Sequence, residues 1–128
     1  MIIETLARDI RIYSKALTIA YMSDYSTRVG SVLAKGNRAY AGAFNVGKND
    51  QKNVPHGFAS VHAEIAAMAC CSEKELPKTT LYIARLSKVE DQMPSRPCVN
   101  CMRSIMRVGI KEIVYLDKYY NLVKERLC

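Results

Sequence analysis

The sequence predicts a single α/β domain in which helices cover a mixed β-sheet. The 128 residues, of which 49% are hydrophobic and 24% are charged, suffice for one globular domain with its own core. Helical and strand-like patterns follow the order α-β-β-α-β-α-β-α. Strand–helix–strand units imply parallel strand pairs, and the first two strands form an antiparallel hairpin. We therefore assign residues 1–128 to one domain.

The N-terminal third of the chain predicts a helix followed by a hairpin. Residues 2–22 have the pattern of an amphipathic helix, because apolar side chains recur at three- and four-residue steps. Val29 to Ala34 is the first strand, Lys35 to Arg38 a turn, and Ala39 to Phe44 the return strand. The apolar positions of the helix are Ile2, Leu6, Ile10, Tyr13, Leu17 and Tyr21.

The middle of the chain predicts a loop, a helix and a strand. Residues 45–59 are rich in Asn, Gly, Lys, Asp and Pro, which is typical of a loop. Ser60 is a candidate N-cap for a helix that runs to about Cys71. After the break at Pro77, the stretch from Thr79 to Leu86 is apolar and β-prone.

The C-terminal part predicts a loop and three further elements. The loop covers residues 87–96, and Pro97 suits the first turn of a helix that ends near Gly109. Ile110 to Leu116 is the next strand, and Tyr119 to Leu127 is expected to form a final short helix.

Two short motifs carry the chemistry. His62-Ala63-Glu64 has the form H-x-E, and Pro97-Cys98-Val99-Asn100-Cys101 has the form P-C-x-x-C. Together they form the signature of the zinc nucleobase deaminases. His62, Cys98 and Cys101 supply three zinc ligands, which leaves the fourth position for water and marks a catalytic site rather than a structural one.

The spacing of these residues suits a site built at helix N-termini. Cys98 and Cys101 are three residues apart, so at the start of a helix both thiolates point the same way. His62 and Glu64 are two apart and act together only if they lie in a first turn. Two thiolates and one neutral imidazole leave zinc with little net charge, so a nearby base is needed to activate water, and Glu64 fits this role.

Other interpretations of the motifs are weaker. A lone C-x-x-C can be a redox dithiol or half of a zinc ribbon, but the chain has no second C-x-x-C. Cys70 and Cys71 lie within the predicted second helix, and we interpret them as core residues. The five cysteines suggest no disulfide framework and fit a reducing compartment, so we expect a cytoplasmic location.

The net charge of +7 favours an anionic partner such as a nucleotide phosphate or a polynucleotide. The basic residues are scattered, without a run of five or more, so the charge alone does not indicate nucleic acid. No apolar run is long enough to cross a membrane, and the N-terminus lacks the pattern of a signal peptide.

From about Arg28 to Leu116 the chain resembles the cytidine and deoxycytidylate deaminase superfamily. Three segments carry the resemblance: the hairpin Val29–Asn45, the first zinc motif His62–Ile65, and the second motif Ser95–Cys101, which Gly109-Ile110-Lys111 follows. The resemblance implies a three-layer α-β-α fold with a five-stranded mixed sheet flanked by helices. It also implies a Zn²⁺ cofactor, with Glu64 as the catalytic proton shuttle.

The resemblance further implies a set of substrate contacts. Asn45 is expected to contact the sugar hydroxyl, and the backbone N–H of Ala63 to hold the pyrimidine carbonyl. Phe44 and Phe58 are candidates to stack on the base, with a core position as the alternative. Arg96 is the main candidate to meet a 5′-phosphate, with Lys48 and Lys52 as further ones and a solvated loop charge as the alternative.

The sequence also departs from the family patterns. Deoxycytidylate deaminases typically read H-A-E-x-N-A, and this chain has Ala66 at the asparagine position. Nucleoside-type cytidine deaminases usually ligate zinc with cysteine where this chain has His62. The tRNA adenosine deaminases usually have a longer C-terminal helix.

We expect hydrolytic deamination of cytosine in a free nucleoside or nucleotide (dCMP, CMP, cytidine or deoxycytidine) by a homo-oligomer. One alternative is a polynucleotide cytosine or adenine deaminase, which would need a basic groove with exposed aromatics. A second alternative is a zinc-stabilised nucleotide-binding module without catalysis, although such a module has no need of Glu64.

Overall fold

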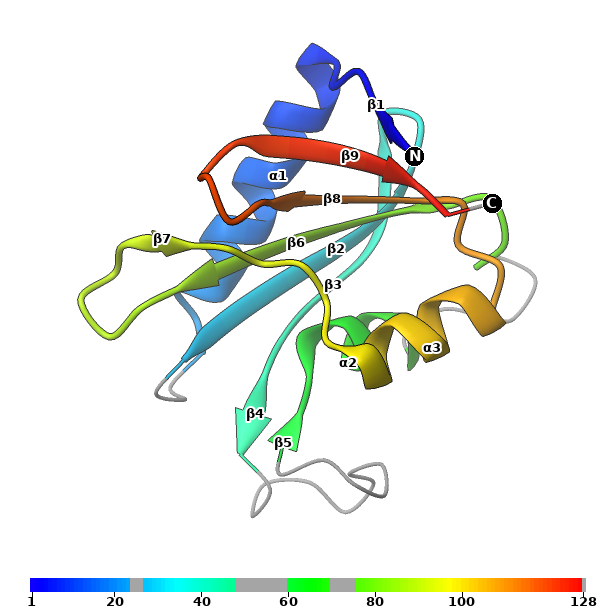
Figure 1. Ribbon diagram of the computed structural model, residues 1–128. Coiled ribbons are helices and arrows are strands. Elements are labelled where there is room, and N and C mark those ends of the chain that lie inside the picture. The colour runs from blue at the N-terminus through cyan, green and yellow to red at the C-terminus, as the bar shows by residue number, and fades with distance from the viewer. Residues whose placement is uncertain (24–26, 48–59, 70–75, 128) are drawn as a thin grey trace.

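A mixed β-sheet forms the centre of the computed structural model, which describes residues 1–23, 27–47, 60–69 and 76–127 (Figure 1). The strand order is β1-β9-β8-β6-β2-β3, and β7 pairs with β6 beside this path. The strands are β1 (Ile2–Ile3), β2 (Arg28–Lys35), β3 (Arg38–Phe44), β6 (Thr80–Leu86), β7 (Gln92–Met93), β8 (Glu112–Leu116) and β9 (Leu122–Arg126). A separate two-stranded sheet pairs β4 (Val46–Gly47) with β5 (Ser60–Val61).

The strand pairing is parallel only between β6 and β8 among the described strands, and the other pairs are antiparallel. The predicted mixed sheet is therefore confirmed, with seven strands rather than five. The parallel pair follows from the chain order, because helix α3 (Val99–Arg107) crosses over between β6 and β8.

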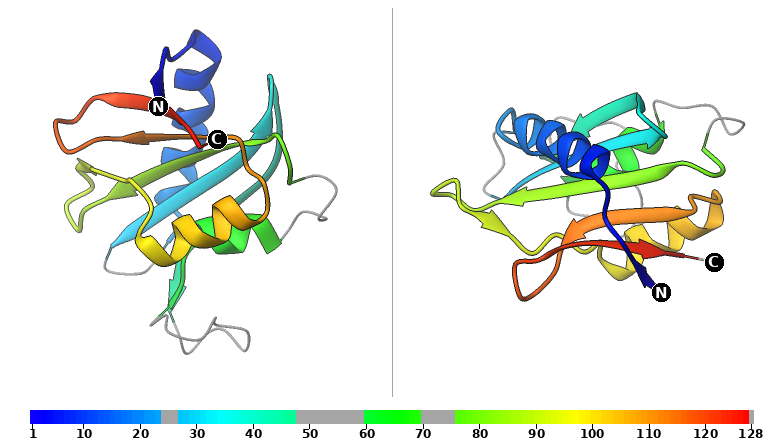
Figure 2. Two further views of the ribbon diagram at one scale, coloured as in Figure 1. Left: turned by 45° about the vertical axis from the view of Figure 1, so that its right-hand side comes forward. Right: turned by 90° about the horizontal axis from the view of Figure 1, so that it is seen from above.

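Three layers result from the alternation of side chains along the central strands. Helix α1 (Ala7–Ala20) packs on one face, and α2 (Ala63–Ala69) and α3 lie on the other (Figures 1 and 2). On β6, Tyr82 and Ala84 face α1, whereas Leu81 and Ile83 join the core on the side of α2 and α3. Odd-numbered residues of this strand therefore lie on one face, and the functional site uses that face.

Close packing of α1 on the sheet depends on a glycine. At Gly30, on β2, a Cβ atom would collide with the backbone of Ala16 and Ala20. The predicted hairpin between β2 and β3 is confirmed, and its turn places Gly36 at a φ of 61°, a value that glycine adopts at little cost.

The predicted first helix is wrong at its N-terminal end. Ile2 and Ile3 form β1, which pairs with β9, and the helix begins only at Ala7. The reason is a local cap: the backbone N–H of Leu6 donates to Oδ2 of Asp9 at 2.7 Å, which fixes the helix start there. Ile2 has the spacing of the helix but is 57% exposed.

The predicted C-terminal helix over Tyr119–Leu127 is also wrong, since Leu122–Arg126 forms β9. Oδ1 of Asp117 accepts hydrogen bonds from the backbone N–H groups of Tyr119 and Asn121, both at 2.9 Å, and Tyr120 has a φ of 66°. This turn reverses the chain and pairs β9 antiparallel with β8.

Other boundaries near the motifs differ from the predictions. Ser60 belongs to β5, and α2 begins only at Ala63, so Ser60 is not at the N-cap position. Pro97 lies just before the N-cap residue Cys98 rather than in the first turn of α3. The predicted loop 87–96 contains β7, and part of the loop 45–59 forms β4. Residues 48–59, Cys70, Cys71 and Cys128 lie outside the described residues.

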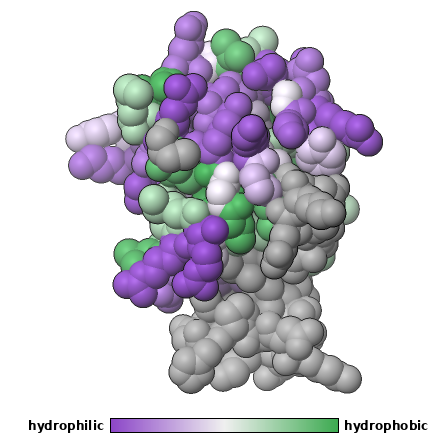
Figure 3. All heavy atoms as spheres, turned by 90° about the vertical axis from the view of Figure 1, so that its right-hand side faces the viewer, coloured by the Kyte–Doolittle hydropathy of each residue, from purple (hydrophilic) through white to green (hydrophobic). Residues whose placement is uncertain are grey.

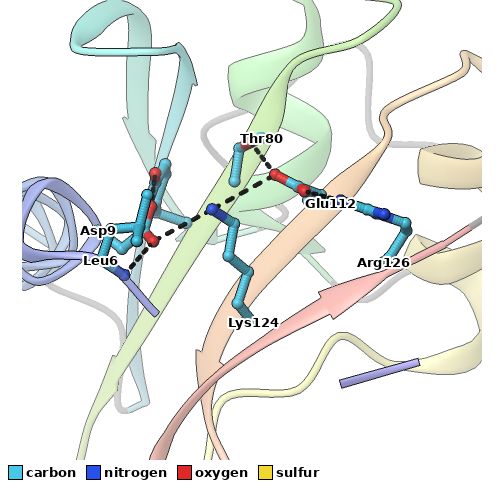
Figure 4. A network of polar contacts seen from close by, with 7 residues as sticks. Leu6, Asp9, Thr80, Glu112, Lys124 and Arg126 are labelled. Carbon is cyan, nitrogen blue, oxygen red and sulfur yellow. Dashed lines mark hydrogen bonds and ion pairs between the residues drawn. The ribbon is translucent and has the colours of Figure 1, made fainter. Parts of the chain in front are cut away.

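A buried polar network connects α1 to the edge of the sheet that holds β8 and β9 (Figure 4). Nζ of Lys124 lies 3.2 Å from Asp9 and 3.6 Å from Glu112, and Arg126 pairs with Glu112 at 3.4 Å. The hydroxyl of Tyr82 also donates to Asp9, at 2.6 Å. Charges removed from water are tolerated here because each has an opposite charge beside it.

On the face shown in Figure 3, hydrophilic residues cover most of the described surface, and hydrophobic residues form small separate areas between them. None of the described helices is both long enough and apolar enough to span a bilayer.

Candidate metal and catalytic site

The first motif lies where β5 leads into α2. The backbone carbonyl of His62 accepts a hydrogen bond from the N–H of Ala66 at 3.0 Å, so His62 stands immediately before the first turn. Oγ of Ser31, on β2, donates to the carbonyl of Ala63 at 2.7 Å and ties the start of α2 to the sheet. Glu64, in the first turn, is buried.

The second motif lies at the start of α3. Cys98 is the N-cap residue with an extended backbone, and its carbonyl accepts a hydrogen bond from the N–H of Met102 at 2.8 Å. Cys101 lies one turn further along and is completely buried, whereas Cys98 is exposed. The helix start therefore presents one thiol from inside the core and one from the surface.

The two motifs meet at one point. Nδ1 of His62 lies 3.2 Å from Sγ of Cys101 and 3.8 Å from Sγ of Cys98, and the three ligand atoms lie within 4.8 Å of one another. Tetrahedral zinc with ordinary bond lengths would hold a histidine nitrogen and a thiolate sulfur about 3.6 Å apart. The distances and the donor chemistry both fit zinc, so His62, Cys98 and Cys101 are positioned to bind it.

Burial sets the protonation of these ligands. Burial lowers the pKa of His62, which favours the neutral imidazole that a metal requires. Burial also raises the pKa of the Cys101 thiol, and the charges of Glu64 and Cys98 raise it further. A metal ion must displace this proton to form a thiolate ligand, so metal binding at this site is coupled to proton release.

Glu64 has the properties of a proton carrier. Burial raises the pKa of its carboxyl group, whereas a backbone hydrogen bond, a hydrogen bond with Cys101 and the charge of Arg85 oppose that rise. A carboxyl group whose pKa is moved toward neutrality exchanges protons more readily near pH 7. The carboxyl group of Glu64 is not among the three ligands positioned for the metal, so it is available to exchange protons.

A cavity of about 240 Å³ opens beside the metal ligands. His62, Glu64 and Cys98 line it on the side of the motifs, and Asn45, Arg85 and Arg96 contribute further polar side chains. The volume is close to the lower end of pockets that hold small molecules. The cavity therefore suits one small ligand placed directly against the metal site.

Asn45, which the resemblance links to the substrate sugar, is a buried part of this cavity wall. Its Oδ1 accepts hydrogen bonds from the N–H of Val29 and the hydroxyl of Ser23, both at 2.8 Å. Its Nδ2 donates to the carbonyl of Thr27 at 2.7 Å. The amide thus braces the start of β2, and since Thr27 is the one acceptor of Nδ2 among the described residues, its second N–H is available to a ligand.

The other predicted contacts have different positions. Ala63 is buried at the start of α2, and Arg96 lines the cavity. Phe44 is half-buried at the end of β3 and is not among the described residues that line the cavity, so its stacking role stays a prediction. Phe58, Lys48 and Lys52 lie outside the described residues.

Arg85 is a cavity residue that sequence reasoning missed. It belongs to β6, where it has the same alternation phase as the buried residues Leu81 and Ile83. A charged residue at a core-facing position of an apolar strand indicates a functional position, because lysine and arginine are rarely buried without a partner.

We compared the chain with models of protein families and with curated proteins. The family model described as "Cytidine and deoxycytidylate deaminase zinc-binding region" matches residues 6–117. None of the curated proteins compared with the chain matches it significantly.

Several solved structures are similar in fold. The dCMP deaminase of cyanophage S-TIM5 in apo form has a TM-score of 0.62 at 19% identity, covering 86% of this chain and 82% of that chain. The cytidine deaminase of Mycobacterium leprae has a TM-score of 0.58 at 16% identity, covering 89% and 88%. RibD of Acinetobacter baumannii (form 2) has a TM-score of 0.54 at 18% identity, covering 83% of this chain but 27% of that longer one.

Proposed function

The chain belongs to the cytidine and deoxycytidylate deaminase family, and we propose that it is a zinc-dependent hydrolase that deaminates the cytosine of a free nucleoside or nucleotide. The products would be uracil in the same compound and ammonia. One observation carries this proposal: Glu64 lies buried in a cavity wall next to His62 and Cys98, with Cys101 completing the metal ligands.

Each residue of the site has a defined part in this reaction. Zinc, when held by His62, Cys98 and Cys101, supplies Lewis acidity that makes water a better nucleophile near neutral pH. Glu64 accepts the proton that the attacking water loses. It passes this proton to the ring nitrogen. It then accepts the proton of the new hydroxyl group at the attacked carbon and passes it to the amino group, so that the C–N bond breaks, the carbonyl forms, and cytosine and water give uracil and ammonia.

The remaining contacts orient the base and the sugar. The N–H of Ala63, at the start of α2, is a donor for the pyrimidine carbonyl, and the remaining N–H of Asn45 is a donor for a sugar hydroxyl. The hydrogen bonds that already hold the Asn45 amide fix its orientation before a ligand binds, which lowers the entropic cost of the contact.

The size of the cavity and the charge of the chain support a small anionic substrate. A cavity of about 240 Å³ suits one base with its sugar. The net charge of +7 favours CMP or dCMP over an uncharged nucleoside. The cyanophage enzyme with the similar fold is also known in complex with dCMP and dUMP, which is consistent with this preference.

Location and assembly extend this proposal. Thiolate ligands require a reducing compartment, so we expect the protein to act in the cytoplasm as one catalytic domain. A homo-oligomer is expected from the family resemblance. Val99 and Met106, seven residues apart on α3, are 68% and 56% exposed and are the apolar side chains that this helix offers to a second copy. Light scattering coupled to gel filtration would measure the assembly.

The test of the proposed function is ammonia release by the zinc-loaded protein from cytidine, deoxycytidine, CMP, dCMP, dCTP and adenosine. The matched variant is Glu64→Gln, which keeps the size of the side chain and removes its proton transfer. We expect one cytosine compound to react and the variant to lose about 10²–10⁴-fold in kcat.

Two results would contradict the proposal. Full activity in Glu64→Gln would remove Glu64 from the mechanism. If the folded, zinc-containing protein releases no ammonia from any of the six compounds, a polynucleotide substrate is favoured. Sequencing of treated single-stranded DNA and tRNA would then detect the deaminated base.

A further inference from the structure

Two arginines line the cavity, and the first of them, Arg96, is already paired. Its Nη2 lies 3.3 Å from Oε2 of Glu125, and its Nε donates to Oε1 of Glu125 at 3.4 Å. Glu125 also accepts a hydrogen bond from the hydroxyl of Tyr115 at 2.7 Å. These contacts hold the guanidinium of Arg96 toward β9 and compensate much of its charge.

The second arginine, Arg85, lacks such a partner. Its Nε atom is buried and makes no hydrogen bond to any residue that the structure describes. Arg85 as a whole is only half-buried, but a single buried N–H donor without an acceptor already costs free energy. The side chain is therefore prepared for an acceptor that the described part of the chain does not provide.

Glu64, the acidic residue that lines the same cavity, does not form an ion pair with Arg85. Arg85 and Glu64 line the same cavity, and the charge of Arg85 acts on the carboxyl group. Even so, none of the ion pairs among the described residues joins the two. A ligand in the cavity can therefore supply the acceptor that Nε of Arg85 lacks among the described residues.

We propose that Arg85 binds the 5′-phosphate of a free mononucleotide and thereby selects nucleotides over nucleosides, an inference that rests on the deaminase function proposed above. The planar guanidinium matches phosphate oxygens with two parallel hydrogen bonds. Arg85 and Asn45, the residue proposed to contact the sugar, both line this cavity, so the sugar and the phosphate of one nucleotide would each have a binding residue.

The cavity favours a mononucleotide over a polynucleotide. Proteins that bind single strands combine a basic groove with aromatic side chains on which successive bases stack. No Phe, Tyr or Trp is among the described residues that line this cavity, and its volume of about 240 Å³ leaves little room beyond one nucleotide.

The test compares dCMP with deoxycytidine, and CMP with cytidine, as substrates of the zinc-loaded protein. In Arg85→Gln we expect kcat/KM for the nucleotide to fall about 100-fold, while the value for the nucleoside stays within about threefold. Arg85→Lys keeps the charge but loses the paired hydrogen bonds, so we expect a loss of about tenfold. Arg103→Gln, at an exposed position of α3, is the matched control and should change neither value.

A binding measurement separates this inference from the proposed function. Calorimetry would give the Kd of dUMP and UMP, and of deoxyuridine and uridine, for the wild-type protein and Arg85→Gln. Tighter binding of the monophosphates that depends on Arg85 supports the inference, even if the protein releases no ammonia from any compound. Circular dichroism and zinc content verify that each variant is folded.

Three outcomes would overturn the inference. An equal loss of kcat/KM on nucleotide and nucleoside in Arg85→Gln would place Arg85 at the base or at Glu64. Unchanged affinity of Arg85→Gln for dUMP and UMP, or no affinity in either protein, would exclude a phosphate contact. Binding of a single-stranded oligonucleotide but not of mononucleotides would assign Arg85 to a polymer.

Discussion

Lys124 of β9 forms a buried ion pair with Asp9 of α1, with 3.2 Å between Nζ and Oδ2. The two residues are 115 positions apart in the sequence, and their side chains are 6% and 0% exposed. Figure 4 shows Lys124 between Asp9 and Glu112, so one ammonium group serves two carboxylates. The pair connects the first helix to the last strand across the face of the sheet opposite the metal site.

Removing the ammonium group should destabilise the fold strongly. Lys124→Met keeps much of the side-chain volume but leaves Asp9 and Glu112 buried without their shared cation. We expect the free energy of unfolding to fall by about 3–5 kcal/mol, measured by urea denaturation followed by circular dichroism. Lys15→Met, at an exposed position of α1, is the control and should change the value by less than about 0.5 kcal/mol. A loss below 1 kcal/mol in Lys124→Met would contradict a structural role for the pair.

Asp9 should also make the protein sensitive to acid. Burial alone would raise its pKa, but hydrogen bonds from Tyr82, from the N–H of Leu6 and from Lys124 together lower it below the ordinary value of 3.8. A carboxyl group with a lowered folded-state pKa contributes stability above its unfolded pKa, and that stability is lost as the pH falls through the folded pKa. The window of this loss therefore lies below about pH 4.

The measurement is the free energy of unfolding between pH 5 and pH 2 for the wild-type protein and Asp9→Asn. We expect a steeper fall with acid in the wild type, because the variant has no carboxyl group to protonate at this position. Parallel curves would show that Asp9 does not contribute to acid unfolding. Other carboxyl groups are present in both proteins, so the difference between the curves isolates Asp9.

Much of this fold could be predicted from the sequence because its signals are local. The hairpin from Arg28 to Phe44 follows from alternating β-prone residues around Gly36, and the strand Thr80–Leu86 from a continuous apolar run. The two errors in element type fall at the ends of the chain, where partners distant in the sequence decide, whereas the errors near the motifs concern boundaries and short strands. Ile2–Ile3 and Leu122–Arg126 become strands because they pair with each other, and β9 also with β8.

In the site, too, some residues follow from a local pattern in the sequence and others depend on the tertiary structure. His62, Cys98 and Cys101 were predicted as metal ligands because their spacing is a chemical pattern, and the structure positions them together. Arg85 could not be recognised in this way, since no motif contains it. Its core-facing phase on β6 is a signal in the sequence, but its place in the cavity wall and its buried Nε without a described partner come from the tertiary structure.

The metal ligands should be required both for zinc content and for stability. The wild-type protein is expected to hold about one zinc per chain, and Cys98→Ala or His62→Ala to lose most of it. Because metal binding adds to the folding free energy, a chelator should lower the Tm of the wild type more than that of either variant. Elemental analysis and thermal unfolding measure the two effects. Cys128→Ser removes a thiol outside the ligand set and should retain the metal, whereas full zinc content in Cys98→Ala would contradict the assignment.

Asn45 should contribute to stability independently of any substrate. Its side chain accepts from the N–H of Val29 and the hydroxyl of Ser23 and donates to the carbonyl of Thr27, so Asn45→Ala leaves buried polar groups without their partner. We expect the free energy of unfolding to fall by about 1–3 kcal/mol in the absence of ligand, measured by urea denaturation. Asn100→Ala, at an exposed position of α3, is the control and should be nearly neutral. An unchanged free energy of unfolding in Asn45→Ala would show that the amide does not brace β2. If Asn45 contacts only the sugar, the substitution would raise KM without changing the free energy of unfolding.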